Sequence, residues 1–455
     1  MPQNSDLNDL RTSSSGPVLA PGDAGFEEAR FVHNGYIDCT PAAIARCITT
    51  ADVVDAVRFG RGAGLEITVR GGGHNVAGRA VCDGGLMIDL SAMKGIFVDS
   101  KNKRARVQGG ATWGEFNRAT QLHGLATTGG VISTTGVGGL TLGGGVGWLM
   151  GKHGLAIDNL RSVELVTAAG EVLAASATEN GDLFWALRGG GGNFGVATSF
   201  EFQLHPVGPM VIGGLLAYPI DQAAAMLRFY REFTATLPDE LTVFAGLLHA
   251  PDGSGTPICA MIFGHCGTAE QAEQDLAAAR AFSTPAMDAL GPIPYTELNG
   301  MLDAGFPKGA RNYWKSSFLA NLSDEAITTI VTQFTTVPSP MSGLLLEHFH
   351  GAVARIGAQE TAFSHRSPGF NFLAASEWID PGSDRANIAW ARETFEAMSP
   401  FFGSGGYVNY LGGDEGPDRV AEAYGSNYTR LQQVKRTYDP GNLFHHNQNV
   451  LPATA

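Results

Sequence analysis

The stretch ITVRGGGHNVAG, residues 67–78, decides how the rest of the chain is interpreted. Its first part, residues 67–69, is apolar and β-branched and predicts a strand. The strand runs into Arg70, three glycines at 71–73, His74 and Asn75. Glycine has no Cβ, so a ligand can come into contact with the backbone, and successive amides of 70–75 can form a nest for an anion. The loop is therefore predicted to hold a ligand and to place an imidazole against it.

Length and composition predict a folded protein of two domains. The chain has 455 residues, which is long for a single hydrophobic core. It is 44% hydrophobic and 16% charged, with a mean hydropathy near zero, as is ordinary for a globular protein. Its 61 glycines cluster at 71–73, 136–147 and 189–195 and follow no fixed period, which excludes collagen-like and solenoid folds.

Charge and the N-terminal sequence predict where the protein acts. A net charge of −14 argues against nucleic acid as a partner, because phosphate binding needs concentrated Lys and Arg. No apolar run approaches the roughly 18 residues of a membrane helix. Residues 1–30 begin MPQNSDLNDLRTSSSG, which lacks a basic region before an apolar one, and are predicted to be a disordered polar leader. Five cysteines without zinc-site spacing are then expected to be reduced thiols in the cytoplasm.

Hydrophobic periodicity predicts an α+β fold with a change of texture near residue 210. The first part is predicted to contain helices at 51–63, 113–122 and 182–187, strands at 67–69 and 86–90, and hairpins at 95–110 and 162–176. The second part is predicted to contain helices at 221–236 and 268–282 and apolar strands at 242–249, 257–264, 344–349 and 370–375. Glycine-rich sequence returns near residue 405 and is followed by a long helix.

Two further glycine clusters raise the question of the ligand. Residues 190–195 spell GxGxxG, but a helical segment precedes them and a strand follows, the reverse of the order that a Rossmann dinucleotide site needs. We therefore reject a Rossmann site. Residues 136–147 contain seven glycines in twelve positions. Such a stretch cannot pack side chains of its own, and we expect it to lie flat against a large planar ligand.

Four stretches carry a resemblance to a known family: RGGGHNVAG, GVGGLTLGGGVGWLMGKHGLAIDNL, FWALRGGGGNFGV, and the terminal YVNY with YDPGNLFHHNQNVLP. Together they resemble the FAD-linked oxidases of the p-cresol methylhydroxylase and vanillyl-alcohol oxidase superfamily, in the berberine bridge enzyme-like branch and its bacterial, hydroxynicotine oxidase-like members. The resemblance extends from about residue 36 to 452. It implies a PCMH-type FAD-binding domain at 31–212, an α+β substrate-binding (cap) domain at 213–404, and a return to the FAD-binding domain at 405–455.

The resemblance also implies how FAD is held. The 70–75 loop would cradle the pyrophosphate, and His74 would bond covalently to a methyl carbon of the flavin ring, for which a nucleophilic side chain is required. Many family members have a second link from a cysteine, but Ile132 stands at that position here, so attachment through His74 only is expected. The residues expected to bind FAD are Arg70, Gly71, Gly72, Gly73, His74, Asn75, Gly78, Gly130, Ser133, Thr134, Thr135, Gly136, Gly139, Leu140, Gly144, Gly145, Gly147, Val196, Tyr407, Asn409 and Asn447.

The expected catalytic base comes from Tyr407-Val408-Asn409-Tyr410. In the family the second tyrosine of a YxNY strand often takes the substrate proton, which maps onto Tyr410. Strand alternation would turn Tyr407 and Asn409 toward the cofactor and Tyr410 toward substrate. A phenol with an ordinary pKa of about 10 needs a cationic or hydrogen-bonding neighbour to act near neutrality. The plain alternative is that both tyrosines are half-buried aromatics of a sheet.

Other polar residues are assigned weaker roles. His348 and His350 share a strand face, but no third ligand is evident, so they are expected to be structural or to contact substrate, and no metal is expected. Lys315 is interpreted as the cation that lowers a tyrosine pKa or as a solvated lysine, and we favour the latter. Structural roles are expected for Arg366, His365, Asp158 and Trp185, with Asp158 capping a turn and Trp185 in the core.

The expected function is a flavin-dependent oxidase. It would take hydride from a CH–OH group of a sugar or secondary alcohol, or from a CH–NH group, and pass the electrons to dioxygen to form hydrogen peroxide. Thr135 stands where oxidases of the family often have valine, so a dehydrogenase that uses another acceptor stays open, as does a non-redox flavin carrier. Phe370, Asn371, Phe372 and Trp378 suit a sugar ring and an aromatic amine equally. The substrate and the oligomeric state are left open.

Overall fold

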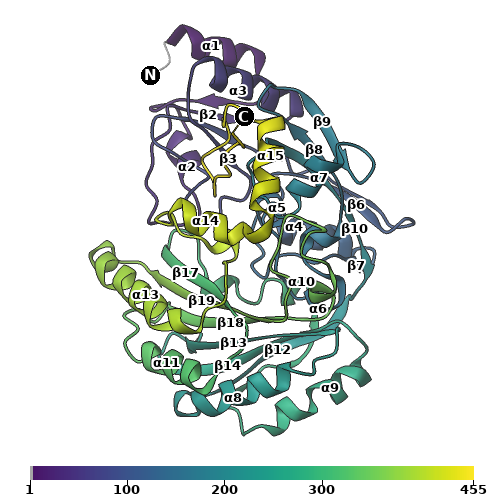
Figure 1. Cartoon of the computed structure of the whole chain (residues 1–455), viewed down its shortest axis with the longest axis vertical. Coiled ribbons are helices and arrows are strands. Elements are labelled where there is room, and N and C mark those ends of the chain that lie inside the picture. The colour runs from purple at the N-terminus through teal and green to yellow at the C-terminus, as the bar shows by residue number, and fades with distance from the viewer. Residues whose placement is uncertain (1–3, 455) are drawn as a thin grey trace.

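The computed structural model describes residues 4–454 and shows two lobes, one above the other in Figure 1. It mixes helices and sheets, as predicted for the α+β class. The first lobe contains residues 4–209 and 405–454, and the second lobe contains residues 210–404. The yellow C-terminal segment of Figure 1 packs beside the purple and teal N-terminal half, so the ends of the chain build one lobe together.

A small sheet at the top of the first lobe carries the 67–78 loop. Its order is β1 (Val18–Leu19), β2 (Ala43–Arg46), β4 (Leu86–Asp89) and β3 (Ile67–Arg70). Strands β2, β4 and β3 are parallel, a relation that the predicted arrangement of hairpins did not include. Helix α3 (Thr50–Gly62) packs on this sheet and begins with a capping box between Thr49 and Asp52. Val53 and Val57 are buried on its inner face, as the periodicity predicts.

The second sheet of the first lobe confirms both predicted hairpins. Its order is β5 (Ile96–Asp99), β6 (Arg104–Gln108), β10 (Val196–Gln203), β8 (Leu160–Val166) and β9 (Val172–Ser176), all antiparallel. Two short strands, β7 (Leu125–Ala126) and β11 (His205–Pro206), pair beside it. Helices α4 (Trp113–Gln121), α5 (Val137–Leu142) and α7 (Gly181–Leu187) pack against this sheet.

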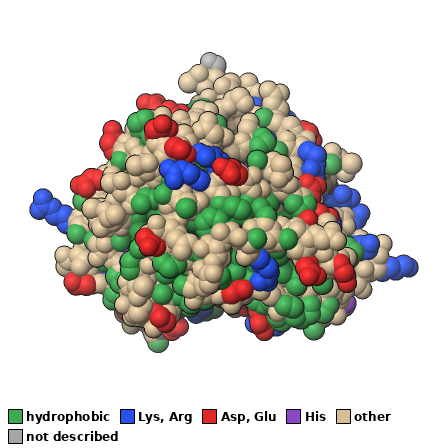
Figure 2. All heavy atoms as spheres, turned by 90° about the horizontal axis from the view of Figure 1, so that it is seen from below, with side chains coloured by type: hydrophobic (Ala, Val, Ile, Leu, Met, Phe, Trp, Pro, Cys, Tyr) green, Lys and Arg blue, Asp and Glu red, His purple; other side chains and the backbone are tan. Residues whose placement is uncertain are grey.

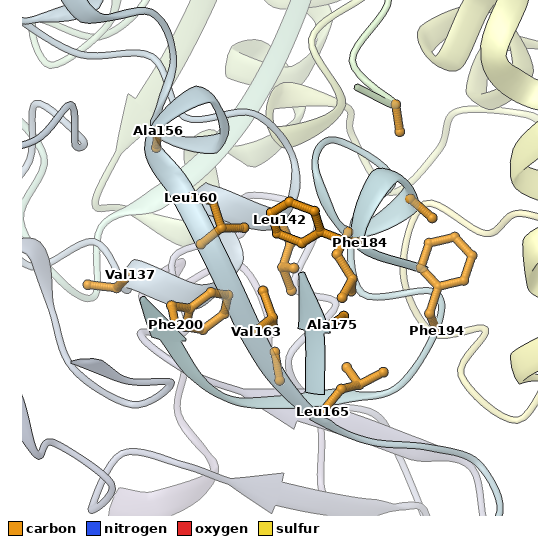
Figure 3. Close-up of a cluster of buried hydrophobic side chains, with 14 of the residues drawn as sticks. Val137, Leu142, Ala156, Leu160, Val163, Leu165, Ala175, Phe184, Phe194 and Phe200 are labelled. Atoms are coloured by element: carbon orange, nitrogen blue, oxygen red, sulfur yellow. The ribbon is translucent and has the colours of Figure 1, made fainter. Parts of the chain in front are cut away.

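Figure 3 shows the hydrophobic core of the first lobe, which lies under the glycine-rich stretch. Val137 and Leu142 at the two ends of α5 point into it, beside Phe200 and Phe184. Gly138 packs on Phe200 on the core side of α5, whereas Gly139 leaves its backbone open on the other side. Close packing from one side therefore holds a nearly bare backbone in a fixed position.

The second lobe is built on one large antiparallel sheet. Its order is β15 (Met287–Asp288), β12 (Met210–Pro219), β14 (Pro257–His265), β13 (Leu241–His249), β18 (Gly343–Phe349), β19 (Gly369–Trp378) and β17 (Arg311–Leu319), with β16 (Gly291–Pro294) paired to β12. The four apolar runs that predict strands in this part become β13, β14, β18 and β19.

The two faces of this sheet meet different partners. Helices α8 (Ala223–Thr234), α9 (Ala269–Ala281), α11 (Asp324–Phe334) and α13 (Asp384–Met398) cover the outer face, at the bottom and left of Figure 1. The inner face packs against the first lobe through Trp148, Phe244, Tyr295, Phe363 and Tyr407. Strand residues that point inward therefore reach the boundary between the lobes.

The N-terminal segment is ordered, which corrects the prediction of a disordered leader over 1–30. Residues 4–30 form α1 (Asn4–Ser13), β1 and α2 (Phe26–Arg30). Leu7 and Leu10 pack into the core beside α3, and Phe26 is fully buried. The apolar residues of this polar segment are spaced to cover neighbouring elements, which composition alone does not reveal. Residues 1–3 lie outside the described part of the chain.

The remaining helices complete both lobes. They are α6 (Met150–His153), α10 (Tyr295–Leu298), α12 (Ala352–Arg355), α14 (Pro417–Tyr424) and α15 (Tyr428–Tyr438). Across residues 4–454, no helix combines the length and apolarity that crossing a bilayer would require. The face seen from below the second lobe shows an apolar band bordered by side chains of both charges (Figure 2).

Candidate active site

A cleft of about 270 Å³ opens in the first lobe and reaches the second lobe at Trp314. One wall combines the 71–75 loop with the loop at 130–136 and α5. The lining also includes 191–193 and residues 444 and 446–448 of the C-terminal segment. The turn at 407–410 closes the end that lies next to the second lobe. Three glycine clusters that are far apart in the sequence therefore line one cavity.

Glycine is required at specific points of these walls. The backbones of Gly72 and Gly136 touch, and a Cβ on either residue would collide with the other. A Cβ built on Gly139 or Gly192 meets no atom of the described structure within 4 Å, although both residues line the cleft. The first pair joins two loops, and the second pair leaves backbone bare toward the cavity.

The structure brings most of the expected ligand-binding residues to the cleft. Those that line it are Gly71, Gly72, Gly73, His74, Asn75, Gly130, Thr135, Gly136, Gly139, Leu140, Tyr407, Asn409, Asn447 and the expected base Tyr410.

Three expected ligand-binding residues have structural roles instead. Arg70 turns away from the cleft and forms two hydrogen bonds to Asp89, of 3.1 and 3.2 Å, at the end of the neighbouring strand. Ser133 bonds to Asp303 of the second lobe, with a backbone N–H to carboxylate distance of 2.7 Å. Val196 is fully buried in the core beneath the small sheet. A polar residue next to these glycines can bind protein groups that hold the loop in place or can bind the ligand. The sequence motif does not distinguish these two roles.

Four glycines also lie behind the wall. Gly78 has φ +71° and packs on Ile37, and Gly147 packs on the Gly129 carbonyl. Gly144 and Gly145 have positive φ, and a Cβ on Gly144 would meet Phe363 and Tyr407 at 3.2 Å. They are needed for close packing beneath the cleft.

The GxGxxG segment proves to belong to the cleft, although not as a Rossmann site. Helix α7 precedes it and β10 follows it, which confirms the reversed order. Gly191, Gly192 and Asn193 nevertheless line the cavity. The Asn193 side chain is fully buried, and it donates to the Gln448 carbonyl at 3.1 Å and accepts from the Val450 N–H at 2.9 Å. Sequence reasoning missed this wall because it judged the segment only against one motif.

His74 stands at the edge of the cleft with two close neighbours. Its ring stacks on the His33 ring with a centroid distance of 3.7 Å and an interplanar angle of 25°. Its Nε2 lies 2.7 Å from the Thr134 hydroxyl. Burial and the nearby His33 lower the pKa of His74 to about 3, so the imidazole is neutral at physiological pH.

The YVNY segment is a 3₁₀ turn over Val408–Tyr410, which corrects the expected strand. Strand alternation therefore does not apply, and the Tyr407 and Tyr410 rings lie 4.8 Å apart. The Tyr407 hydroxyl accepts from the Gly145 N–H at 2.9 Å and from Asn409 Nδ2 at 2.8 Å. Tyr407 thus holds the glycine-rich stretch from below, while Tyr410 points toward the second lobe.

Tyr410 meets a buried carboxyl group that the sequence analysis did not single out. Its hydroxyl donates to Glu347 Oε1 at 2.9 Å, and Asn371 Nδ2 donates to Glu347 Oε2 at 2.7 Å. Burial raises the pKa of Glu347 to about 7, against the effect of these two hydrogen bonds. Burial and the carboxylate raise the pKa of Tyr410 well above its ordinary value. A cationic or hydrogen-bonding neighbour was expected for this tyrosine, and the neighbour is a hydrogen-bonding carboxyl group.

Two more residues near the cleft were not singled out by the sequence analysis: a cation, Arg79, and an aromatic residue, Trp314. Arg79 lines the cleft, and its guanidinium makes no hydrogen bond or ion pair to residues 4–454. Burial lowers its pKa. Trp314 packs edge-on against Tyr410 at 5.5 Å and against Phe306 at 5.8 Å. Arg79 and Trp314 belong to no sequence motif, so the sequence does not indicate that they line the cleft.

The weaker candidates take structural positions. Lys315 is buried, not solvated, and bonds to Asp414 at 3.1 Å and Glu415 at 2.7 Å. His348 and His350 stack at 5.1 Å, and His348 lies against Phe370 of the outer-face core. The described chain contains no cluster of three side chains suited to a metal.

The remaining assignments concern buried polar and aromatic groups. Arg366 forms a buried two-bond pair with Asp158 at 2.7 and 2.8 Å, and Asp158 also accepts from the Leu155 N–H at 2.8 Å, as expected of a turn cap. Trp185 lies in the core, and the five cysteines are unpaired in the described structure. Of the residues offered as an aromatic pocket, Phe370 and Phe372 belong to the outer-face core, and only Asn371 points inward.

Comparison with known proteins agrees with this geometry. Residues 41–176 match the model of the FAD binding domain, and residues 406–451 match the model of berberine and berberine-like proteins. The (R)-6-hydroxynicotine oxidase of Paenarthrobacter nicotinovorans is 34% identical over 455 residues, which cover 97% of each chain.

Two solved structures show the same arrangement. The 6-hydroxy-D-nicotine oxidase of Arthrobacter nicotinovorans is 33% identical with a TM-score of 0.87, over 97% of this chain and 99% of that one. The glucooligosaccharide oxidase of Acremonium strictum, described as having a 6-S-cysteinyl, 8α-N1-histidyl FAD, is 25% identical with a TM-score of 0.88, over 99% and 100%. This chain therefore belongs to the berberine bridge enzyme-like family and is an FAD-dependent oxidoreductase.

Proposed function

We propose that the protein is an oxidase that takes hydride from a CH–OH or CH–NH carbon and passes the electrons from a covalently bound FAD to dioxygen, forming hydrogen peroxide. The observation that carries this proposal is the hydrogen bond from Tyr410 to Glu347 at the end of the glycine-lined cleft. It supplies a proton acceptor beside a cavity built for a flat, anionic cofactor.

The residues of the cleft fit FAD. Gly139 and Gly192 both leave bare backbone toward the cavity, which suits a flat cofactor in contact with main-chain atoms. The Arg79 guanidinium makes no hydrogen bond or ion pair in the described structure and therefore suits the diphosphate, since a partly buried cation favours an anionic partner. The side-chain oxygens of Asn447 and Gln448 are buried without a partner in the described structure, and both residues line the cavity. These polar atoms are ready to accept hydrogen bonds from the cofactor.

Attachment through His74 only is part of the proposal. A neutral imidazole at the cleft edge has a lone pair available to form a carbon–nitrogen bond with a ring methyl. Ile132 lines the cleft in the loop where family members have a cysteine, and a hydrocarbon side chain cannot form the second link. The histidyl and cysteinyl attachment described for the glucooligosaccharide oxidase supports the chemistry of both positions.

The bound flavin would supply a two-electron acceptor, and the protein would supply the path for the proton. Substrate O–H or N–H would give its proton to Tyr410 while the Tyr410 proton moves to Glu347. A phenol whose pKa is raised is a poor acceptor alone, so the neighbouring carboxylate is needed. The path exists only when Glu347 is ionised, which its pKa of about 7 permits near neutrality.

The side chains near this end favour a substrate with an apolar ring. Val131, Ile132, Val146 and Trp314 line the cavity there and offer few hydrogen bonds. Sugar recognition needs several polar contacts, whereas an aromatic or alicyclic amine or alcohol needs mainly apolar surface and one proton acceptor. The hydroxynicotine oxidases among the relatives agree with this class of substrate.

The test is a panel of cyclic secondary amines, benzylic alcohols and oligosaccharides, with hydrogen peroxide measured in air and dye reduction measured without oxygen. Peroxide that forms in step with substrate oxidation supports the oxidase. Thr135 lines the cleft and is the observation that favours the second candidate, a dehydrogenase. Turnover with a dye but no peroxide in air would establish that candidate instead.

A further inference from the structure

We propose that His33 and Thr134 are positioning residues that prepare His74 for flavin attachment. This inference rests on the proposed attachment through His74. It concerns the stack of two imidazole rings beside the cleft and the hydroxyl that faces one of them.

The side chain of His74 needs external support. It follows three glycines, so the residues directly before it offer no side chain to fix its rotamer. The His33 ring covers one of its faces at a centroid distance of 3.7 Å. A ring held on one face keeps its plane but can still present either nitrogen to the cleft.

Thr134 determines which nitrogen is free. Its hydroxyl lies 2.7 Å from His74 Nε2, while His74 Nδ1 makes no hydrogen bond to any described residue. In the tautomer in which Nε2–H donates to the Thr134 oxygen, the lone pair is on Nδ1. The stack and the hydrogen bond together therefore select one plane and one reactive atom.

His33 is itself held on both sides. The backbone N–H of His33 donates to the Gly73 carbonyl at 3.0 Å, which ties the His33 backbone to the residue before His74. Its carbonyl accepts from the Gly309 N–H at 2.9 Å, from a segment of the second lobe. A small second cavity lies between His33, His74, Phe306 and Trp314. The support is thus built from both lobes and does not depend on the cofactor.

The electrostatics agree with a positioning role. Burial, with a smaller effect of Lys308, lowers the pKa of His33 to about 4, so both rings are neutral and do not repel each other at physiological pH. In the attachment, one methyl C–H bond and the imidazole N–H bond are lost and one C–N bond forms. The two electrons and two protons go to the flavin's own ring system, and dioxygen can then reoxidise it. His33 takes no part in these bonds.

The experiment measures the rate at which acid-stable flavin accumulates when protein made under limiting flavin is incubated with FAD. The variants are His33→Ala, His33→Phe and Thr134→Val. We expect His33→Ala and Thr134→Val to slow attachment by about tenfold or more, as loss of a fixed orientation does. His33→Phe keeps an aromatic ring on His74 and should restore most of the rate. Neither His33 nor Thr134 lines the cleft, although Thr134 was expected to bind FAD, so all three variants should still bind one acid-releasable FAD, which separates attachment from folding.

The outcomes distinguish covalent attachment through His74 from the positioning roles of His33 and Thr134. Wild-type protein that forms no acid-stable flavin would refute the attachment itself. Wild-type attachment with an unchanged rate in His33→Ala would refute the inference, and so would a His33→Phe variant as slow as His33→Ala. NMR of the isolated histidyl flavin gives an independent readout, in which substitution on Nδ1 is expected and substitution on Nε2 would overturn the assignment.

Discussion

Replacement of Glu347 by Gln tests whether Tyr410 works alone or passes its proton on. The Tyr410 hydroxyl has one acidic neighbour, Glu347 Oε1 at 2.9 Å, and Gln keeps the size of that side chain but cannot accept the proton. A positioned base contributes about 10²–10⁴ to the rate of proton transfer. Both Glu347→Gln and Tyr410→Phe should therefore slow anaerobic flavin reduction by about that factor. The double variant should be no slower than either single variant, because the two groups form one path.

The pH dependence gives a second and independent measure. Because burial places the pKa of Glu347 at about 7, the acceptor is protonated and inactive in more acidic solution. As the pH is increased toward 7, the rate of flavin reduction should rise about tenfold per pH unit, and above 7 it should level off. In Glu347→Gln this limb should disappear, leaving only titrations of the substrate.

The assay is stopped-flow reduction of the flavin with excess substrate under argon. Tyr407→Phe is the matched control, since Tyr407 holds Gly145 and Asn409 and not the acceptor. Loss of its hydroxyl should lower the free energy of unfolding by about 1–3 kcal/mol and change the reduction rate much less. Normal rate and normal pH profile in Glu347→Gln would refute the path. A slow Glu347→Gln with a normal Tyr410→Phe would show that the carboxylate takes the proton directly.

The remaining expectations concern the cofactor and stability. His74→Ala should release all flavin on acid precipitation while wild type retains it, and mass spectrometry should find flavin on one peptide only; a two-peptide crosslink would contradict the role assigned to Ile132. Arg79→Met should weaken binding of FAD, measured by fluorescence titration in the His74→Ala background, and leave riboflavin binding unchanged, whereas equal losses would place Arg79 at the ring. Glu377 is buried without a partner in the described structure and burial raises its pKa to about 8, so the folded state keeps a proton that the unfolded chain releases near pH 4.5. The free energy of unfolding should fall as pH rises between these values, by at most roughly 3 kcal/mol at pH 7, and a Glu377→Gln variant that keeps this slope in thermal melts would exclude the assignment.

The parts of this fold that could be predicted from sequence are those encoded by local patterns. The alternation at 95–110 and 162–176 predicts hairpins, and the periodicity at 51–63 predicts α3. The glycine clusters predict bare backbone, since only contact with a ligand or another loop requires so many residues without side chains. The N-terminal helix was missed because Leu7 and Leu10 gain their stability from α3, which is distant in sequence.

The catalytic geometry could be predicted only in part, for a related reason. Tyr410 was found because it lies in a recognisable motif, but Glu347 is one acidic residue in an apolar strand, and its role comes from the chain fold that brings β18 against the 407–410 turn. The YVNY segment has strand-like residues, yet Asn409 binds the Leu140 carbonyl at 3.0 Å and the Tyr407 hydroxyl, which favours a turn. Tertiary hydrogen bonds here override local β propensity.

The flavin-binding residues and the two ends of the proton path are distributed differently over the two lobes. The glycine loops, His74 and Thr134 belong to the first lobe. The proton path joins Tyr410 of the returning chain to Glu347 of the second lobe. Proton transfer therefore requires the lobes to stay in register, because a displacement of about 1 Å at a reacting pair costs on the order of 10²-fold in rate. Buried Asn34 helps to keep that register, since it bonds the Val76 carbonyl of the first lobe at 2.8 Å and the Asn312 carbonyl of the second at 2.9 Å.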